Sequence, residues 1–138
     1  MINHLAVLLL ATACTADPVG LEQTLWEATL IGTLAYPDFM GSAAAVSGAN
    51  RTAISILVEG LPSGSTFAWR LRSGDCDNPG SVFSSEDAYP DLEIGESGSA
   101  TTDIAISRLL SVNNTYHVAV LTIDPEPEPV ACGNLIRR

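Results

Sequence analysis

The sequence predicts an all-β fold, a Greek-key β-sandwich of seven to eight short strands. Apolar residues make up 46% of the chain while aromatic residues make up only 6%, so mainly aliphatic side chains must fill the core. Short runs in which apolar and polar residues alternate are separated by glycine, proline and asparagine, and no segment has a helical period. For a chain of 138 residues we expect a single domain.

The N-terminal stretch from Leu5 to Ala13 is apolar or small without a break and ends at Cys14. A helix of this length spans about 14 Å, far less than the roughly 30 Å of a membrane-spanning helix. The stretch therefore predicts the hydrophobic part of a signal peptide. Leu10 to Cys14 also resembles a bacterial lipobox, whose cysteine is lipidated and becomes the mature N-terminus. An ordinary cleaved signal peptide is the alternative.

These features predict an exported protein of the bacterial cell envelope. We expect a signal peptide over residues 1–13, a lipid on Cys14 that holds the protein to a membrane, and a tether over residues 14–24, which show no periodic pattern. The residue after the cysteine is Thr15. In lipoproteins of this kind, a residue other than aspartate there implies sorting to the outer membrane, facing the periplasm or the cell surface.

The folded domain is expected over residues 25–138, and it begins with three strands. They are predicted over residues 25–34, 43–47 and 51–58, with a turn at residues 48–50. Along the third strand, one set of alternate side chains is aliphatic and is expected to face the core. This set is Ile54, Ile56 and Val58.

A fourth strand over residues 65–72 alternates almost without interruption. Its apolar set is expected to be buried and consists of Phe67, Trp69 and Leu71. Burial of that set places Arg70 and Arg72 on the outer face. There the two guanidinium groups are expected to hold a carboxylate of the following loop, Glu86 or Asp87; contact with an anionic ligand or a protein partner is the alternative.

The second half of the domain contains one long irregular stretch and four further strands. Residues 75–90 are polar and contain glycine, and loops of this length are uncommon without a functional or covalent reason. A proline-rich segment near the C-terminus is expected to be an extended connector. The strands are predicted over residues 92–94, 100–107, 116–123 and 130–136, and the connector over residues 124–129.

The net charge is −10, and all six basic residues are arginine. Phosphate binding needs a basic face, so we expect no nucleic-acid partner. Carboxylates gather around the long loop and in the connector. A solvated acidic surface is the expected explanation, and binding of a divalent cation is the alternative. These residues are Asp75, Asp77, Glu86, Asp87, Asp91, Glu93, Asp124, Glu126 and Glu128.

Three cysteines are an odd number for an exported protein. If a lipid occupies Cys14, then Cys76 and Cys132 remain to form one disulfide in an oxidising compartment. In the chain-entropy model, closing a loop of this length stabilises the fold by about 4 kcal/mol. Neither of the two later cysteines is expected to be catalytic, because no histidine lies near either of them in the sequence.

Two stretches that contain these cysteines resemble bacterial lipoproteins with a copper/zinc superoxide dismutase-like or CHRD-like fold. Arg70 to Cys76 is similar to the His-x-His-x-Gly-x-Cys stretch of that group, and Pro129 to Leu135 is similar to its C-terminal Ala-Cys-Gly strand. The resemblance extends over Trp26 to Ile136. It implies a sandwich of the immunoglobulin-like or superoxide dismutase-like type and a bond between the two cysteines.

The metal ligands of that family are missing from the matching positions. Arg70 and Arg72 stand where paired histidines would be, and Val120 stands about where a later histidine falls. Arginine stays protonated in proteins and offers no lone pair to copper or zinc. We therefore expect no metal site, no cofactor and no catalytic residue. His117 is expected to be a hydrogen-bonded structural histidine.

The resulting prediction is a lipid-anchored, non-catalytic β-sandwich module with a structural or binding role. One alternative is a metal-binding, superoxide dismutase-like enzyme with atypical ligands such as His117, Asp75 and Asp77. The other is a cell-surface adhesive or carbohydrate-binding domain, which needs an exposed aromatic platform. Trp26 and Trp69 are expected to be buried, which argues against this second alternative.

Overall fold

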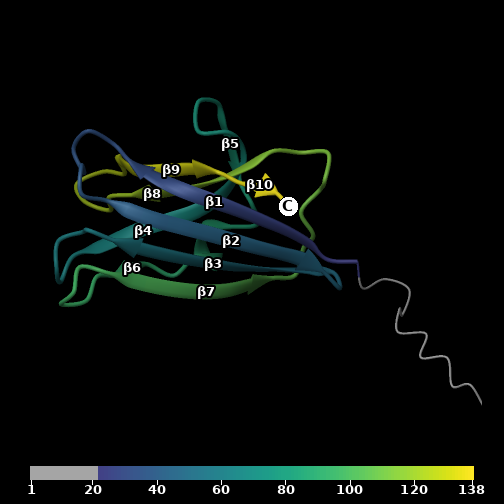
Figure 1. Ribbon diagram of the computed structural model, residues 1–138, viewed down its shortest axis with the longest axis horizontal. Helices are drawn as coiled ribbons and strands as arrows, with labels where there is room; N and C mark the ends of the chain where they lie inside the picture. Colours follow the sequence, from purple (N-terminus) through teal and green to yellow (C-terminus); the bar gives the residue numbers. More distant parts are fainter. Residues whose placement is uncertain (1–21) are drawn as a thin grey trace, which may run out of the picture.

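The computed structural model describes residues 22–138, and the all-β prediction is confirmed (Figure 1). The predicted signal peptide over residues 1–13 and the predicted lipidation site, Cys14, lie outside the described residues. Within residues 22–138, no helix has the length and apolar character needed to cross a membrane. The elements are β1 (Thr24–Gly32), β2 (Met40–Gly48), β3 (Arg51–Glu59), β4 (Thr66–Gly74), β5 (Pro79–Val82), the 3-10 helix η1 (Glu86–Ala88), β6 (Leu92–Glu93), β7 (Ala100–Ile106), β8 (Tyr116–Leu121), β9 (Pro129–Asn134) and β10 (Ile136–Arg137).

Eight of the strands form one continuous antiparallel sheet in the order β5-β4-β8-β9-β1-β2-β3-β7. The short strand β10 pairs with the start of β1, and β6 pairs with the start of β4. The sheet curls so that β6 lies beside β7 at the other edge (Figure 1). The hydrogen-bonded path shows no break into two sheets, so the Greek-key sandwich arrangement stays a prediction.

We name the two ends of this curled sheet by the direction of β1, which begins at the near end and finishes at the far end. At the near end the chain enters at residue 22, and the C-terminus lies there too (Figure 1). Because neighbouring strands are antiparallel, the strand order determines which connecting loops lie at the far end. They are residues 33–39, 60–65, 94–99 and 122–128.

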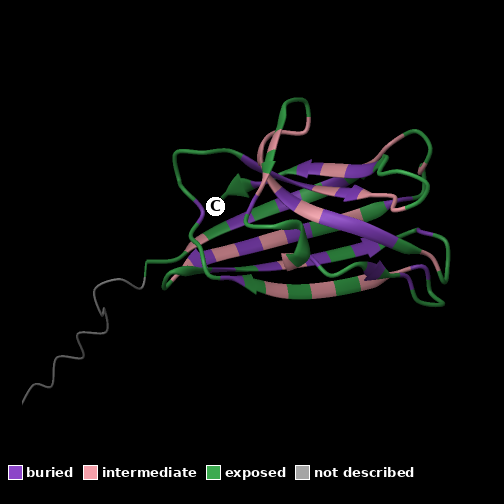
Figure 2. Ribbon diagram, turned by 180° about the vertical axis from the view of Figure 1, so that it is seen from behind, coloured by how far each residue is buried: buried purple, intermediate pink, exposed green. Residues whose placement is uncertain are grey.

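The inner face of the curled sheet holds the core, and alternate residues along the strands are buried (Figure 2). The predicted inward sets of the third and fourth strands are confirmed, since all six side chains are buried. Trp69 is fully enclosed and donates its indole N–H to the carbonyl oxygen of Pro90, at 2.8 Å. Burying a large apolar side chain contributes roughly 1.5–3 kcal/mol, so this face accounts for most of the stabilisation.

The stretch predicted to be irregular, residues 75–90, is more ordered than the sequence indicates. It contains β5, which pairs with β4 through Arg72 and Val82, and the 3-10 helix η1. The glycine, serine and proline of β5 are poor strand formers, and Pro79 is tolerated because it begins an edge strand. The segment that follows closes the opening of the curled sheet with four buried apolar side chains. These are Phe83, Tyr89, Leu92 and Ile94.

Several predicted strands also have different bounds, among them the fourth, which ends at Gly74, and the strand predicted over residues 116–123, which ends at Leu121. The first strand ends at Gly32 rather than residue 34, and Leu34 lies in the following loop. The second strand is longer than residues 43–47 at both ends. The predicted last strand divides into β9 and β10 around Leu135, whose side chain turns into the core. Together with β5, this division raises the number of strands within residues 22–138 from the seven or eight predicted to ten.

Candidate functional site

Two residues singled out by the sequence, Arg72 and His117, meet Asn134 on the outer face of three neighbouring strands. Arg72 of β4 and His117 of β8 are cross-strand partners, and His117 is in turn the partner of Asn134 on β9. Directly opposed residues point to the same face of a sheet. Because the neighbouring Leu71 and Val118 are buried in the core, these three side chains belong to the outer face.

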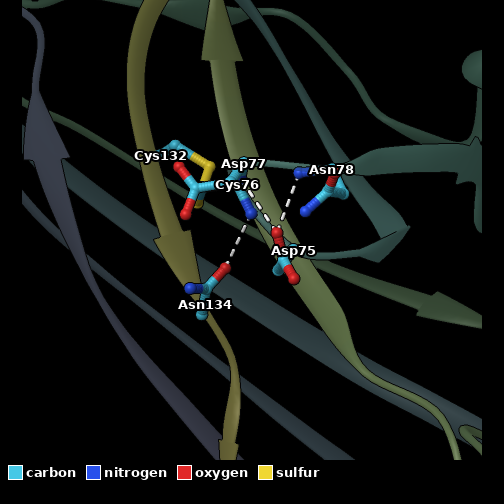
Figure 3. Close-up of a disulfide and its surroundings, with 6 residues drawn as sticks. All are labelled: Asp75, Cys76, Asp77, Asn78, Cys132 and Asn134. Carbon is cyan, nitrogen blue, oxygen red and sulfur yellow. Dashed lines mark hydrogen bonds between the residues drawn. A yellow bond between two sulfur atoms is a disulfide. The ribbon is translucent and has the colours of Figure 1, made fainter.

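A disulfide-bonded segment lies beside Asn134, at one end of this row (Figure 3). The predicted disulfide is confirmed: Cys76 and Cys132 are bonded, with their Cα atoms 6.0 Å apart. Because β8 lies between β4 and β9, the chain that leaves β4 must pass over β8 to reach Cys132. The backbone N–H of Cys76 also donates to Asn134 Oδ1, at 2.9 Å. We call residues 74–78 the strap.

The strap is shaped by a glycine and an aspartate. Gly74 has a φ of +85°, the left-handed region that favours glycine, and a Cβ there would overlap the carbonyl oxygen of Asn78. The Asp75 carboxylate accepts the backbone N–H groups of Asp77 and Asn78 through the same oxygen, at 2.9 and 2.8 Å (Figure 3). This Asx-type turn directs Cys76 toward β9.

His117 is buried beneath the strap although it belongs to the outer face, with only 1% of its surface exposed. Burial lowers the pKa of His117, and the Arg72 guanidinium lowers it further. The nearby backbone of Gly74 and the Asp75 carboxylate raise the pKa of His117 and partly offset this change. Nδ1 of His117 is buried without a hydrogen-bond partner. His117 is buried, as expected of a structural histidine, but the expected hydrogen bond is not found at Nδ1, and the setting favours the neutral imidazole.

Arg70 and Arg72 both lie on the outer face, as predicted, and each has a partner within the protein. Arg70 Nη2 lies 3.5 Å from Glu86 Oε2, which is the pairing expected with the following loop. The Arg70 side chain is 18% exposed, whereas that of Glu86 is 68% exposed, so solvent screens the ion pair. Arg72 Nε donates to the carbonyl oxygen of Gly80, at 2.9 Å, and fixes the hairpin between β4 and β5.

The residues present do not fit the copper or zinc site that the resemblance implies. Two permanent cations, Arg70 and Arg72, occupy the ligand positions on the outer face. Val120 is fully buried in the core. The Asp75 carboxylate is engaged by backbone N–H groups of the strap. Among residues 22–138, no group of three or more histidine, cysteine, aspartate and glutamate side chains is arranged to hold a metal ion.

A hollow lies on the outer face of β1, β2, β3 and β7, with a volume of about 760 Å³. Charged, small polar and aliphatic side chains line it, and none of the lining residues is aromatic. The charged residues are Glu27, Asp103 and Arg138. Trp26 and Trp69 are buried, as predicted. The hollow therefore lacks the stacking surface on which the carbohydrate-binding alternative depends.

The fold and site define an all-β domain in which a disulfide-bonded strap covers an outer-face histidine. The sequence matches no model of a known protein family, and no curated protein matches it. Function must therefore be argued from the residues of this chain.

Sequence reasoning found the cysteines, the arginines and the histidine, but not how they are joined. It did not predict that the strap buries His117. An outer-face residue is buried only when another segment of the chain covers it, and the alternation of side chains along a strand does not show such a covering segment. The Gly-Asp-Cys order at Gly74 to Cys76 is the local signal of the turn. Asn134, which fastens the strap, had no signal beyond its place near Cys132.

Proposed function

We propose that this protein is an exported, lipid-anchored binding module without catalytic activity. In this proposal it resembles the superoxide dismutase-like or CHRD-like lipoproteins in its frame and lacks their metal site. The lipid on Cys14 holds it to the outer membrane, and the β domain carries its contacts with other molecules.

The observation that carries the proposal is the disulfide. Cys76 and Cys132 bond to each other, so Cys14 has no cysteine left in the chain with which to pair. A structural disulfide is typical of proteins that fold in an oxidising compartment, such as the bacterial periplasm. A cysteine directly after an apolar stretch, with the other two cysteines of the sequence bonded to each other, then supports lipidation.

The position of the N-terminal strand also supports a tether. β1 begins at Thr24, so residue 22, where the described chain begins, lies at the opposite end of the sheet from the far-end loops. The segment from Cys14 to Gln23, if fully extended, reaches about 30 Å. That length would let an anchored domain stand clear of the lipid headgroups.

The chemistry of the outer face supports a role in binding rather than catalysis. Arg70 and Arg72 hold Glu86 and Gly80, and neither can serve as a metal ligand or as a base at neutral pH. An external anion at this face would have to displace the Glu86 carboxylate from Arg70. Such exposed pairs contribute only about 0–1 kcal/mol, so an anionic group of a partner can compete for Arg70.

Lipidation is tested by mass spectrometry of the mature protein made in a Gram-negative host with its own N-terminal segment. We expect a mass that begins at Cys14 and includes attached acyl chains, and recovery in the membrane fraction. Cys14→Ser should abolish both. A mature N-terminus at any other residue, or an unmodified Cys14, contradicts the anchor.

The catalytic alternative is tested separately by metal analysis. The protein is purified without chelators and without added metal, and its copper and zinc contents are measured against protein concentration. We expect less than stoichiometric metal. Stoichiometric copper or zinc that is lost in His117→Asn would overturn the non-catalytic proposal and favour atypical ligands around that histidine.

A further inference from the structure

The charge of the protein is divided unevenly between its two ends. Seven exposed carboxylates lie in the far-end loops or next to them: Asp38, Glu59, Glu93, Glu96, Asp124, Glu126 and Glu128. All six arginines lie in the middle of the sheet or toward the near end: Arg51, Arg70, Arg72, Arg108, Arg137 and Arg138. The far end thus presents one sign of charge, which attracts cationic groups and repels anionic ones.

An open cleft lies within this acidic end. Its volume is about 510 Å³, which is enough to take a large side chain. Six residues line it: Tyr36, Thr66, Phe67, Thr122, Ile123 and Asp124. The Tyr36 ring meets the buried Phe67 ring edge to face, with centroids 6.1 Å apart, so one wall of the cleft is anchored to the core.

The far end also carries exposed apolar side chains. Leu34 is fully exposed in the loop that also carries Tyr36. At the far-end termini of β1 and β2, Ile31 and Met40 are cross-strand partners and are 72% and 67% exposed. A cleft and exposed apolar side chains at one charged end of a protein are together typical of an interaction site.

We propose that the far end docks a basic segment of a partner protein, with one apolar side chain of that segment in the cleft. The lysine or arginine residues that flank the apolar anchor would lie against Asp124, Glu126 and Glu128. This inference rests on the binding role proposed above. It does not depend on the lipid anchor.

The charge distribution selects this occupant over others. A second copy of the chain docked far end to far end would place seven carboxylates against seven, which opposes association. Anionic lipid surfaces and nucleic acids are repelled for the same reason. A divalent cation would satisfy the carboxylates but would leave the cleft and the exposed leucine without a role.

The probe is a short fluorescent peptide in which one leucine is flanked on both sides by arginines. It is titrated against the full mature chain in neutral detergent, and binding is followed by anisotropy at low and at high salt. We expect saturable binding that weakens with salt. A peptide with glutamates in place of the arginines, and one with serine in place of the leucine, should bind much more weakly.

The location is tested with charge-matched variants. The triple variant Asp124→Asn, Glu126→Gln and Glu128→Gln should weaken binding about tenfold, since each exposed charge pair contributes a fraction of that free energy. Its control neutralises three exposed carboxylates away from the far-end loops and should bind as the unaltered protein does. The control residues are Glu22, Asp77 and Asp87.

The apolar contact is tested with a second matched pair. Leu34→Ser should weaken binding of the leucine peptide, whereas Leu109→Ser, an exposed leucine at the near end, should not. Equal binding of the arginine and glutamate peptides, or equal weakening by both triple variants, would overturn the proposal. So would tight Ca²⁺ binding that displaces the peptide. These outcomes are independent of the modification at Cys14, which the mass measurement decides.

Discussion

Arg72 and His117 face each other across β4 and β8, so a permanent cation lies beside an imidazole that the strap almost completely encloses. Placing a second positive charge there is unfavourable, because burial and Arg72 both oppose protonation. The pairing therefore links the stability of the fold to pH through one side chain.

The first prediction concerns this pH dependence. Burial lowers the pKa of His117 in the folded protein, while in the unfolded chain His117 takes up a proton near its ordinary value of 6.5. Between the folded pKa and about pH 6.5, the unfolded state binds more protons, so stability must fall as pH is lowered through that window. Above about pH 6.5 the stabilisation is fully present. Each unit of pKa difference corresponds to about 1.4 kcal/mol.

Urea unfolding at about pH 7.5 and about pH 5.5 measures this effect. His117→Asn should unfold with a smaller difference in free energy between the two pH values. Because both proteins share all the carboxylates, any titration of those groups cancels in the comparison. An unchanged pH dependence in the variant would show that His117 does not carry it.

The second prediction concerns the strap itself. The disulfide joins residues separated by 56 positions, for which chain entropy predicts about 4 kcal/mol of stabilisation. The double variant Cys76→Ser, Cys132→Ser should lose about that amount and become insensitive to reductant. The unaltered protein should lose a similar amount when reduced. Equal unfolding midpoints for the oxidised and reduced protein would contradict this account.

Loss of the strap should also change the environment of His117. With the disulfide removed, residues 74–78 are no longer held across β8, and the imidazole gains access to water. Its pKa should move back toward the ordinary value, and the pH dependence of stability described above should shrink. Nuclear magnetic resonance titration of the histidine ring measures this directly in the double variant.

The sequence predicted the parts of the fold that depend on alternation within one strand. The inward sets of β3 and β4 were found because the alternation of apolar and polar residues within each strand indicates which face is buried. β5 was missed because its pairing is imposed by β4 and by the Arg72–Gly80 hydrogen bond, against the propensities of a Pro-Gly-Ser sequence. Its pairing is a tertiary effect.

The sequence identified most residues of the candidate site but not their arrangement in space. Cysteine counting gave the pair Cys76 and Cys132, and the alternation of β4 gave the outward direction of Arg70 and Arg72. The burial of His117 follows from the strand order β4-β8-β9, which sets β8 under the strap. Strand order is long-range information, and the uneven charge of the two ends depends on it too.

A third prediction concerns a buried polar network at the near end. Ser47 Oγ accepts the backbone N–H of Leu110 at 2.9 Å and lies 3.0 Å from Thr52 Oγ1. Thr52 Oγ1 donates to the carbonyl oxygen of Arg108 at 2.6 Å, so the two hydroxyls fasten the segment after β7. Ser47→Ala would leave the buried N–H of Leu110 unpaired, at a cost of about 1–3 kcal/mol.

Thermal or urea unfolding checks the third prediction, with Ser42→Ala as the control. Ser42 lies on the same strand but is exposed, so its removal should change stability by less than about 0.5 kcal/mol. If the two variants are equally stable, the hydroxyl of Ser47 does not satisfy a buried group.

The fourth prediction separates backbone strain from steric contact in the 60–65 loop. Gly60 and Gly64 have nearly equal φ values, +76° and +78°, in the region that favours glycine. A Cβ at Gly60 would overlap the carbonyl oxygen of Asp38, whereas a Cβ at Gly64 would meet open space. Both alanine variants should pay about 1 kcal/mol for the backbone conformation. Gly60→Ala should lose about 1–3 kcal/mol more, because the loop that carries Asp38 must move. The difference between the unfolding free energies of the two variants measures the contact with Asp38. Equal losses of stability would show that the loop carrying Asp38 moves aside without a cost in free energy.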